Sequence, residues 1–180
     1  MSGASFSDSS IPLRPTARVG GFLLEKKLDE DNLGSLWEAE EVELGRRVAL
    51  RFLAQELASD PEQASRFKKE ANAAARLRHP AFVRLHGIEE EGGHLFMVQE
   101  LVPGRRNLYA DFDERNRAGW KTSKTACRDA VERFLVLAEG LAVAHEAGIV
   151  HRNISPRNLY LDEDGSLRLA DFGMAMVGNQ

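Results

Sequence analysis

The chain contains the stretch His151-Arg152-Asn153-Ile154-Ser155-Pro156-Arg157-Asn158, and Asp171-Phe172-Gly173 begins thirteen residues after Asn158. Between them, the apolar runs Leu159-Tyr160-Leu161 and Leu167-Arg168-Leu169-Ala170 flank the turn Asp162-Glu163-Asp164-Gly165. Two such runs around an Asp-Gly turn predict a β-hairpin, whose ends would bring Asn158 and Asp171 side by side. An amide oxygen and a carboxylate in that position are hard ligands that suit Mg²⁺. This part of the chain therefore predicts a hairpin that carries a metal-binding pair.

Length and composition indicate a folded protein. The chain has 180 residues, 43% of them hydrophobic, which is enough for a sizeable core. Its net charge of −4 gives no basic surface for nucleic acid. The single cysteine, Cys127, excludes an internal disulfide and a cysteine zinc site. No apolar run is long enough for a membrane span and no signal-peptide core is visible, so we expect no membrane partner and a cytoplasmic location.

The first half of the chain combines a polar start with several strand patterns. Residues 1–18 are rich in Ser, Gly and Pro and predict a disordered tail. Strands are expected at Phe22–Leu24, Ser35–Ala39, Val48–Leu53, Phe82–Ile88 and His94–Val102. Ser59-Asp60-Pro61-Glu62 has the composition of a helix start. The helix that follows is indicated by the helical spacing of Ala64, Phe67, Ala71, Ala74 and Ala75.

The second half predicts helices around the opening stretch. Residues 105–125 are polar and irregular and indicate a loop or a short helix. Residues 126–147 predict a long helix that Gly148 ends. Its apolar stripe consists of Val131, Phe134, Leu135, Ala138, Leu141, Ala142 and His145. For His145 and His151 a structural role is favoured over metal binding.

Taken in order, these segments resemble the protein kinase family. Residues 151–158 resemble its catalytic loop, H-R-D-x-x-x-x-N, and Asp171-Phe172-Gly173 its D-F-G motif. Val48-Ala49-Leu50-Arg51 is similar to the V-A-I-K strand, and Leu28 to Gly34 occupy the place of the Gly-rich loop. The helix that contains Glu70 resembles the family's αC helix.

The resemblance implies an α+β, protein-kinase-like fold in two lobes. The N-terminal lobe would span residues 19–102. Residues 103–180 would form part of the C-terminal lobe, ending just after the D-F-G motif. Within the family, the chain resembles the bacterial eukaryotic-like serine/threonine kinases. The resemblance covers about two-thirds of the family's domain.

The resemblance also implies which residues would serve ATP and Mg²⁺. Asn158 and Asp171 would bind the metal. Arg51 would hold the phosphates and pair with Glu70. Glu100 to Val102 would be the hinge that meets adenine, with Gln99 as gatekeeper. The nucleotide-binding set is Leu28, Gly34, Leu36, Ala49, Arg51, Glu100, Val102 and Tyr160.

The family's catalytic positions are altered here. Asn153 replaces the catalytic Asp, and Ser155 replaces a lysine that follows it by two residues. Arg51 replaces the lysine of the V-A-I-K strand. An amide cannot accept a proton from a substrate hydroxyl, and serine brings no positive charge to the transferring phosphate. Asp29 and Asp31 replace two glycines of the Gly-rich loop and place negative charge where a triphosphate would lie.

These departures favour a pseudokinase, with at most weak Mg·ATP binding and a regulatory or interaction role toward another protein. The alternative is an active serine/threonine kinase that transfers the γ-phosphate to a protein hydroxyl with an altered set of Asn153, Ser155, Arg51 and Glu70. A third hypothesis, compatible with the first, is a truncated or split chain that does not fold alone. An aminoglycoside-phosphotransferase-like protein fits the two motifs less well.

Overall fold

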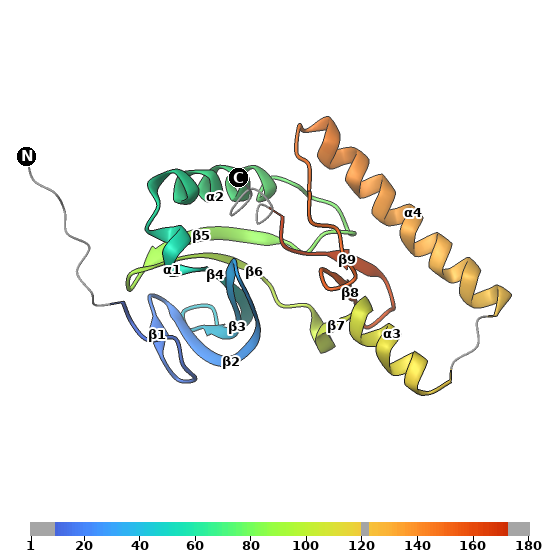
Figure 1. Cartoon of the computed structure of the whole chain (residues 1–180), viewed down its shortest axis with the longest axis horizontal. Helices are drawn as coiled ribbons and strands as arrows, with labels where there is room; N and C mark the ends of the chain where they lie inside the picture. The colour runs from blue at the N-terminus through green and yellow to red at the C-terminus, as the bar shows by residue number, and fades with distance from the viewer. Residues whose placement is uncertain (1–9, 120–122, 173–180) are drawn as a thin grey trace, which may run out of the picture.

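The computed structural model describes residues 10–119 and 123–172. Figure 1 shows a six-stranded sheet with helix α2 lying along it, and a smaller part with three short strands and helices α3 and α4. Within these described ranges, no helix has both the length and the apolar character that crossing a bilayer requires. The arrangement confirms the predicted α+β class.

The larger sheet is antiparallel throughout, with strand order β1-β2-β3-β4-β6-β5. Its strands are β1 (Arg18–Val19), β2 (Phe22–Asp31), β3 (Gly34–Glu41), β4 (Arg46–Leu53), β5 (Leu85–Glu91) and β6 (His94–Glu100). The strand expected from Phe82 begins only at Leu85. Residues 81–83 instead bond to β9 of the smaller sheet, where Val83 N–H donates to the Leu169 carbonyl at 2.9 Å. This backbone contact joins the two lobes.

The β2–β3 hairpin is longer and tighter than predicted. Residues 28–31, expected in a loop, continue β2, so that only Asn32 and Leu33 form the turn. The carboxylate of Asp31 accepts hydrogen bonds from the backbone N–H groups of Leu33 and Gly34 at 2.9 and 3.1 Å. Because this side chain satisfies the turn amides, the chain can reverse within two residues.

Gly34 is required by the close approach of β3 to β4. Its φ is +139°, and a Cβ there would lie 1.9 Å from the backbone oxygen of Phe52. We therefore expect Gly34→Ala to lower the free energy of unfolding by about 2–4 kcal/mol, since backbone strain and a steric clash add. Gly21→Ala is the matched control, because its Cβ would meet nothing within 4 Å. Urea denaturation compares the two variants, and equal stabilities would contradict the expectation.

Helix α2 (Pro61–Ala74) begins and packs as predicted, after the single turn of α1 (Gln55–Ala58). Asp60 caps it by accepting hydrogen bonds from the backbone N–H groups of Glu62 and Gln63, at 2.8 and 3.3 Å. Its buried side chains are Gln63, Phe67, Ala71 and Ala74. This face packs against β5 and places α2 beside the cleft between the lobes.

Residues 10–17 belong to the predicted disordered tail, yet they lie against the sheet. Ile11 N–H donates to the Gly92 carbonyl at 3.0 Å, and His94 Nε2 donates to the Ile11 carbonyl at 2.6 Å. Ile11, Leu13 and Ala17 pack on the sheet's core. The prediction of disorder is wrong here because these apolar side chains find buried partners. Residues 1–9 lie outside the described ranges.

The smaller sheet has the order β7-β8-β9 and follows a 3₁₀ turn, η1 (Pro103–Arg105). Its strands are β7 (Arg106–Asn107), β8 (Leu159–Leu161) and β9 (Leu167–Leu169). Helix α3 (Leu108–Arg117) occupies the region expected as a loop or short helix. Asn107 caps it by accepting a hydrogen bond from Ala110 N–H at 2.9 Å.

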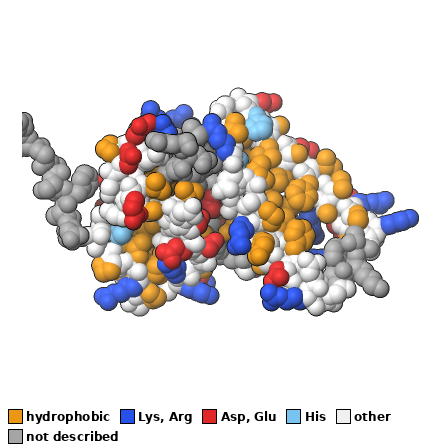
Figure 2. Space-filling model, in the orientation of Figure 1, with side chains coloured by type: hydrophobic (Ala, Val, Ile, Leu, Met, Phe, Trp, Pro, Cys, Tyr) orange, Lys and Arg blue, Asp and Glu red, His pale blue; other side chains and the backbone are white. Residues whose placement is uncertain are grey.

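Helix α4 (Lys124–Glu146) confirms the predicted long helix, but most of its predicted stripe faces outward. Only Leu137, Gly140 and Ala144 are buried. Val131, Phe134 and Leu135 are 59%, 45% and 57% exposed, and His145 is exposed as well, so it has no packing role. Figure 2 shows hydrophobic side chains gathered over the part of the molecule that holds α3 and α4. An apolar surface therefore lies open along α4.

Candidate functional site

The hairpin of β8 and β9 brings the two predicted metal ligands together. Tyr160 pairs with Arg168 at its centre, and Ala170 N–H donates to the Asn158 carbonyl at 2.9 Å. Asn158 and Asp171 therefore lie at the open end of the hairpin, on adjacent strand ends. The hairpin predicted from the Asp-Gly turn is confirmed.

The loop from His151 to Asn158 is held by hydrogen bonds that do not use the Asn153 side chain. The His151 ring donates from Nε2 to the Ala170 carbonyl at 2.8 Å and accepts at Nδ1 from Asn153 N–H at 3.2 Å. Asn158 Nδ2 donates to the Asn153 carbonyl at 2.8 Å. Burial lowers the pKa of His151, outweighing the Ala170 hydrogen bond and the charge of Asp171. His151 is therefore neutral at pH 7 and structural, as predicted.

Asp171 has features typical of a binding residue. Its φ is +64°, its side chain is buried, and Oδ1 has no hydrogen-bond partner among the described residues. Strained backbone and an unsatisfied buried oxygen are both typical of functional sites. The Nδ2 atom of Asn158 donates to the Asn153 carbonyl within the loop. The amide oxygen of Asn158 is therefore available as a second ligand atom. These two side chains fit Mg²⁺.

The metal would need further ligands from elsewhere. No cluster of three or more His, Cys, Asp or Glu side chains suited to a metal occurs in the described part of the chain. Mg²⁺ commonly binds through one or two protein oxygens together with substrate phosphates. A metal held by Asn158 and Asp171 would therefore depend on a bound nucleotide.

A recess between the lobes collects five of the predicted nucleotide-binding residues. These are Leu36, Ala49, Glu100, Val102 and Tyr160. Val83, Gln99, Leu101 and Ala170 complete its wall, and its empty volume is ≈ 230 Å³. Apolar and aromatic side chains predominate in its lining, which suits a flat ring. Leu28, Gly34 and Arg51 were also predicted to contact nucleotide, but they do not line this recess.

A second recess of ≈ 310 Å³ lies behind Gln99, which is buried and lines both spaces. Gln99 thus lies between the two recesses, and the gatekeeper role that the resemblance implies for it stays a prediction. Asp171 and Phe172 line the rear recess, where the Phe172 ring packs at 4.7 Å from that of Phe82 and 4.4 Å from that of His151. Gly173 lies outside the described residues.

Arg51 binds Asp31 and not Glu70, which corrects one prediction. Arg51 Nη2 donates to Asp31 Oδ2 at 2.5 Å, and no Arg51–Glu70 ion pair occurs among the described residues. Burial lowers the pKa of Arg51, but the charges of Asp171, Asp31 and Asp29 outweigh it and raise that pKa, so the guanidinium stays charged. The extended β2 strand brings Asp31 to Arg51, whereas Glu70 remains half-buried on α2.

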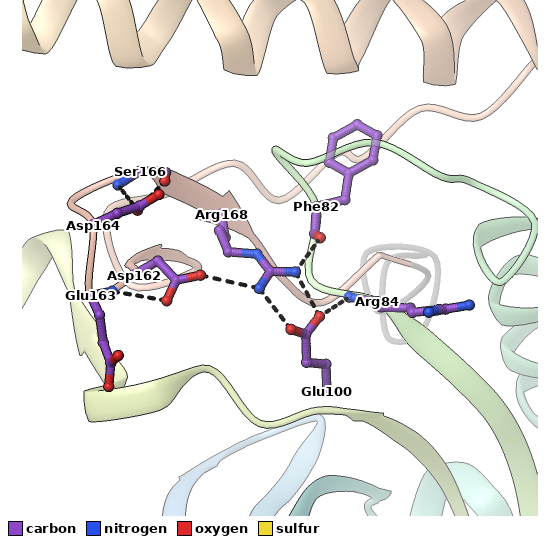
Figure 3. Close-up of polar contacts among 8 residues, drawn as sticks. All are labelled: Phe82, Arg84, Glu100, Asp162, Glu163, Asp164, Ser166 and Arg168. Atoms are coloured by element: carbon purple, nitrogen blue, oxygen red, sulfur yellow. Dashed lines mark hydrogen bonds and ion pairs between the residues drawn. The ribbon is translucent and has the colours of Figure 1, made fainter.

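Arg168 links the lobes through contacts that the sequence patterns did not indicate (Figure 3). Its Nη1 and Nη2 atoms donate to the two carboxylate oxygens of Glu100 at 2.7 and 2.6 Å. Nη2 also donates to the Phe82 carbonyl at 3.0 Å, and Nη1 to Asp162 at 3.3 Å. An arginine between two apolar strand residues has the pattern of a solvent-facing side chain. No local signal therefore pointed to this role.

The Glu100–Arg168 pair predicts a pH-dependent stability. Burial raises the pKa of Glu100, but the hydrogen bonds and charge of Arg168 outweigh it and lower that pKa from the ordinary 4.5. The stability from this pair is therefore present above the ordinary value and lost as the pH falls through the lowered folded value. Wild type should exceed Glu100→Gln by about 2 kcal/mol near neutral pH and lose that advantage at an acid pH well below the ordinary 4.5. Urea denaturation at both pH values measures this.

The double variant Glu100→Gln/Arg168→Ala is the control for that experiment. It removes both charges, so its stability should change less between the two pH values than that of wild type. If the stability difference between wild type and Glu100→Gln were the same at acid and neutral pH, the assigned role of Glu100 would be wrong.

Two lobes around an apolar recess, with Asn158 and Asp171 at the end of a hairpin beside a loop of the catalytic type, define a protein-kinase-like domain. The chain belongs to the protein kinase family, since the model of the protein kinase domain matches residues 22–180.

The known relatives that the chain matches include serine/threonine-protein kinases. Serine/threonine-protein kinase PknA of Mycobacterium tuberculosis is 34% identical over 161 residues, which cover 87% of this chain and 36% of PknA. Pkn2 of Myxococcus xanthus is also 34% identical over 161 residues, covering 88% and 18% of the two chains. The M. tuberculosis PknI kinase domain, solved as a double mutant, matches with a TM-score of 0.78 and 25% identity, covering 91% and 65%. The chain thus spans about a third of PknA and about two-thirds of the PknI chain.

Proposed function

We propose that this domain is a pseudokinase: a serine/threonine-kinase-like module that does not transfer phosphate and that regulates or binds another protein. The observation that carries the proposal is Asn153. It occupies the catalytic Asp position of the family in a loop whose backbone is held by His151 and Asn158. The loop keeps its shape while the proton acceptor is absent from it.

The altered side chains lack groups that phosphate transfer needs, while the hydrogen bonds that hold the loop remain. A carboxylate at position 153 would accept the proton of a substrate hydroxyl, and the neutral amide of Asn153 cannot. Ser155 supplies no positive charge toward a transferring phosphate, whose charge must be stabilised in the transition state. Arg51 keeps its charge, but Asp31 already binds its guanidinium. Glu70 does not position Arg51.

Weak binding of Mg·ATP is part of the proposal. The adenine ring would lie between Leu36, Ala49 and Tyr160, with hydrogen bonds to the backbone of residues 100–102. Asn158 and Asp171 would hold Mg²⁺, which supplies charge neutralisation for the phosphates when bound. Asp31 adds negative charge beside the phosphate path and lowers the affinity. A protein partner and a cytoplasmic location complete the proposal.

Thermal melts with Mg·ATP test the nucleotide part. Ligand stabilisation grows with the ratio of ligand concentration to Kd, so a weak site gives little shift at micromolar ATP and a clear one at millimolar ATP. Asp171→Ala should abolish the millimolar shift, because it removes the metal ligand. Asp164→Ala, on the exposed turn of the same hairpin, should keep it. A shift of several degrees at micromolar ATP would contradict weak binding.

An active serine/threonine kinase is the second candidate. It is favoured by the unsatisfied Oδ1 of Asp171, which is the arrangement that a metal-dependent phosphotransferase needs. A direct assay of phosphate transfer separates the two candidates.

A further inference from the structure

Asp31 makes two kinds of contact at the tip of the β2–β3 hairpin. Its Oδ1 accepts hydrogen bonds from the backbone N–H groups of Leu33 and Gly34 at 2.9 and 3.1 Å. Its Oδ2 accepts one from Arg51 Nη2 at 2.5 Å. One carboxylate thus binds two turn amides and a guanidinium at the same time.

These donors are of the kind that bind phosphate-type anions in proteins, namely turn amides beside an arginine. In this chain they surround an internal carboxylate. The side chain of Arg51 is only 3% exposed, whereas that of Asp31 is 45% exposed. The cation is therefore fixed within the sheet, and the carboxylate is the partner that can move out into water.

Arg51 also has unused capacity for an anion. Its Nε is buried and has no hydrogen-bond partner among the described residues. The charge of Asp171 acts on the guanidinium, together with those of Asp31 and Asp29. A phosphate that replaced Asp31 would therefore meet a cation close to the residue proposed to hold its metal.

We propose that Asp31 is an internal competitor for an anion site formed by Arg51 and the turn amides of Leu33 and Gly34. A phosphate-type anion binds there only when the Asp31 carboxylate leaves. This regulation rests on the proposed function, because the phosphates of the bound nucleotide are the anion concerned. Asp31 does not line the recess proposed for adenine, so its departure changes affinity for phosphate and not for the base.

Two charge-removing variants on one strand test the proposal. Asp31→Asn removes the competing charge, while its amide oxygen can still accept from the turn amides. Asp29→Asn is the matched control, because it makes the same change in net charge near Arg51. Asp29 contributes to the field at Arg51, but its carboxylate accepts its hydrogen bond from Glu30 N–H.

Isothermal titration with inorganic tripolyphosphate, without metal, is the measurement on the 180-residue chain. Asp31→Asn should bind about tenfold more tightly than wild type, and Asp29→Asn less than about threefold. Adding Arg51→Met to Asp31→Asn should remove the gain. An equal gain in the two single variants, or no gain in Asp31→Asn, overturns the proposal. Circular dichroism checks each fold, and Asp31→Ser, whose hydroxyl can also accept from the turn amides, is a second variant for the same test.

Adenosine separates this proposal from the proposed function. It carries no phosphate and should bind wild type and Asp31→Asn equally. If tripolyphosphate binds Asp31→Asn more tightly but adenosine binds no variant, nucleotide binding is wrong and the role of Asp31 stands. If adenosine binds throughout but tripolyphosphate shows no gain, the role of Asp31 is wrong and the nucleotide site stands.

Discussion

No phosphate transfer above background is expected when the chain is incubated with labelled ATP, Mg²⁺ or Mn²⁺ and a basic protein substrate. A positioned general base contributes about 10²–10⁴-fold to such reactions, and Asn153 cannot act as one. Loss of the charge at Ser155 removes a further electrostatic contribution of about 10²-fold or more. Together these losses bring transfer below the detection limit of an ordinary end-point assay.

The control for this assay is Asp171→Ala. If wild type transfers phosphate and Asp171→Ala does not, the activity belongs to the metal site and the domain is an active kinase. Asn153→Asp is the complementary variant, because the hydrogen bonds of the loop use the backbone of Asn153 and not its side chain. The variant should fold like wild type, so any gain in transfer reports the restored base.

The 180-residue chain is expected to self-associate through helix α4. Phe134 and Leu135 are about half exposed on this helix, and burying one such side chain contributes about 1.5–3 kcal/mol. Phe134→Glu and Leu135→Glu should each weaken association by about tenfold or more and raise the monomer fraction. Light scattering after size-exclusion chromatography measures this directly.

Leu137→Glu is the matched control on the same helix, because Leu137 is 3% exposed and belongs to the core. The same substitution two or three residues away should abolish cooperative unfolding rather than improve solubility. A wild-type chain that is monomeric at high concentration and melts cooperatively would show that the exposed face of α4 does not drive association.

Sequence patterns predicted the structure well where one local rule decides it. The Asp-Gly turn located the β8–β9 hairpin, Asp60 located the start of α2, and Gly148 the end of α4. In each case the residues that determine the conformation are neighbours in the chain. The prediction for residues 10–17 was wrong, because it was based on the polar composition of the segment. Three apolar side chains within the segment pack on the core of the sheet.

Partners that are distant in the chain were harder to predict. The resemblance to kinases paired Glu70 with Arg51. In the structure the lengthened β2 strand places Asp31 beside Arg51, and these two residues form the ion pair. Arg168 reaches Phe82, which lies 86 positions away, and no periodicity reports such a pair. The resemblance grouped Leu36, Ala49 and Tyr160, and the structure brings all three to the wall of one recess.

The hydrogen bond from Asn158 to the Asn153 carbonyl has a consequence for how such domains diverge. A lineage that has stopped transferring phosphate would still lose this loop if Asn158 were replaced by a residue without an amide donor. Selection for folding alone therefore retains an asparagine that looks like the mark of a metal enzyme. The side chain of Asn153 makes no hydrogen bond within the described residues and is under no such restraint. Substitution at position 153 therefore leaves the hydrogen bonds of the loop intact, whereas Asn158 serves the loop as well as the proposed metal site.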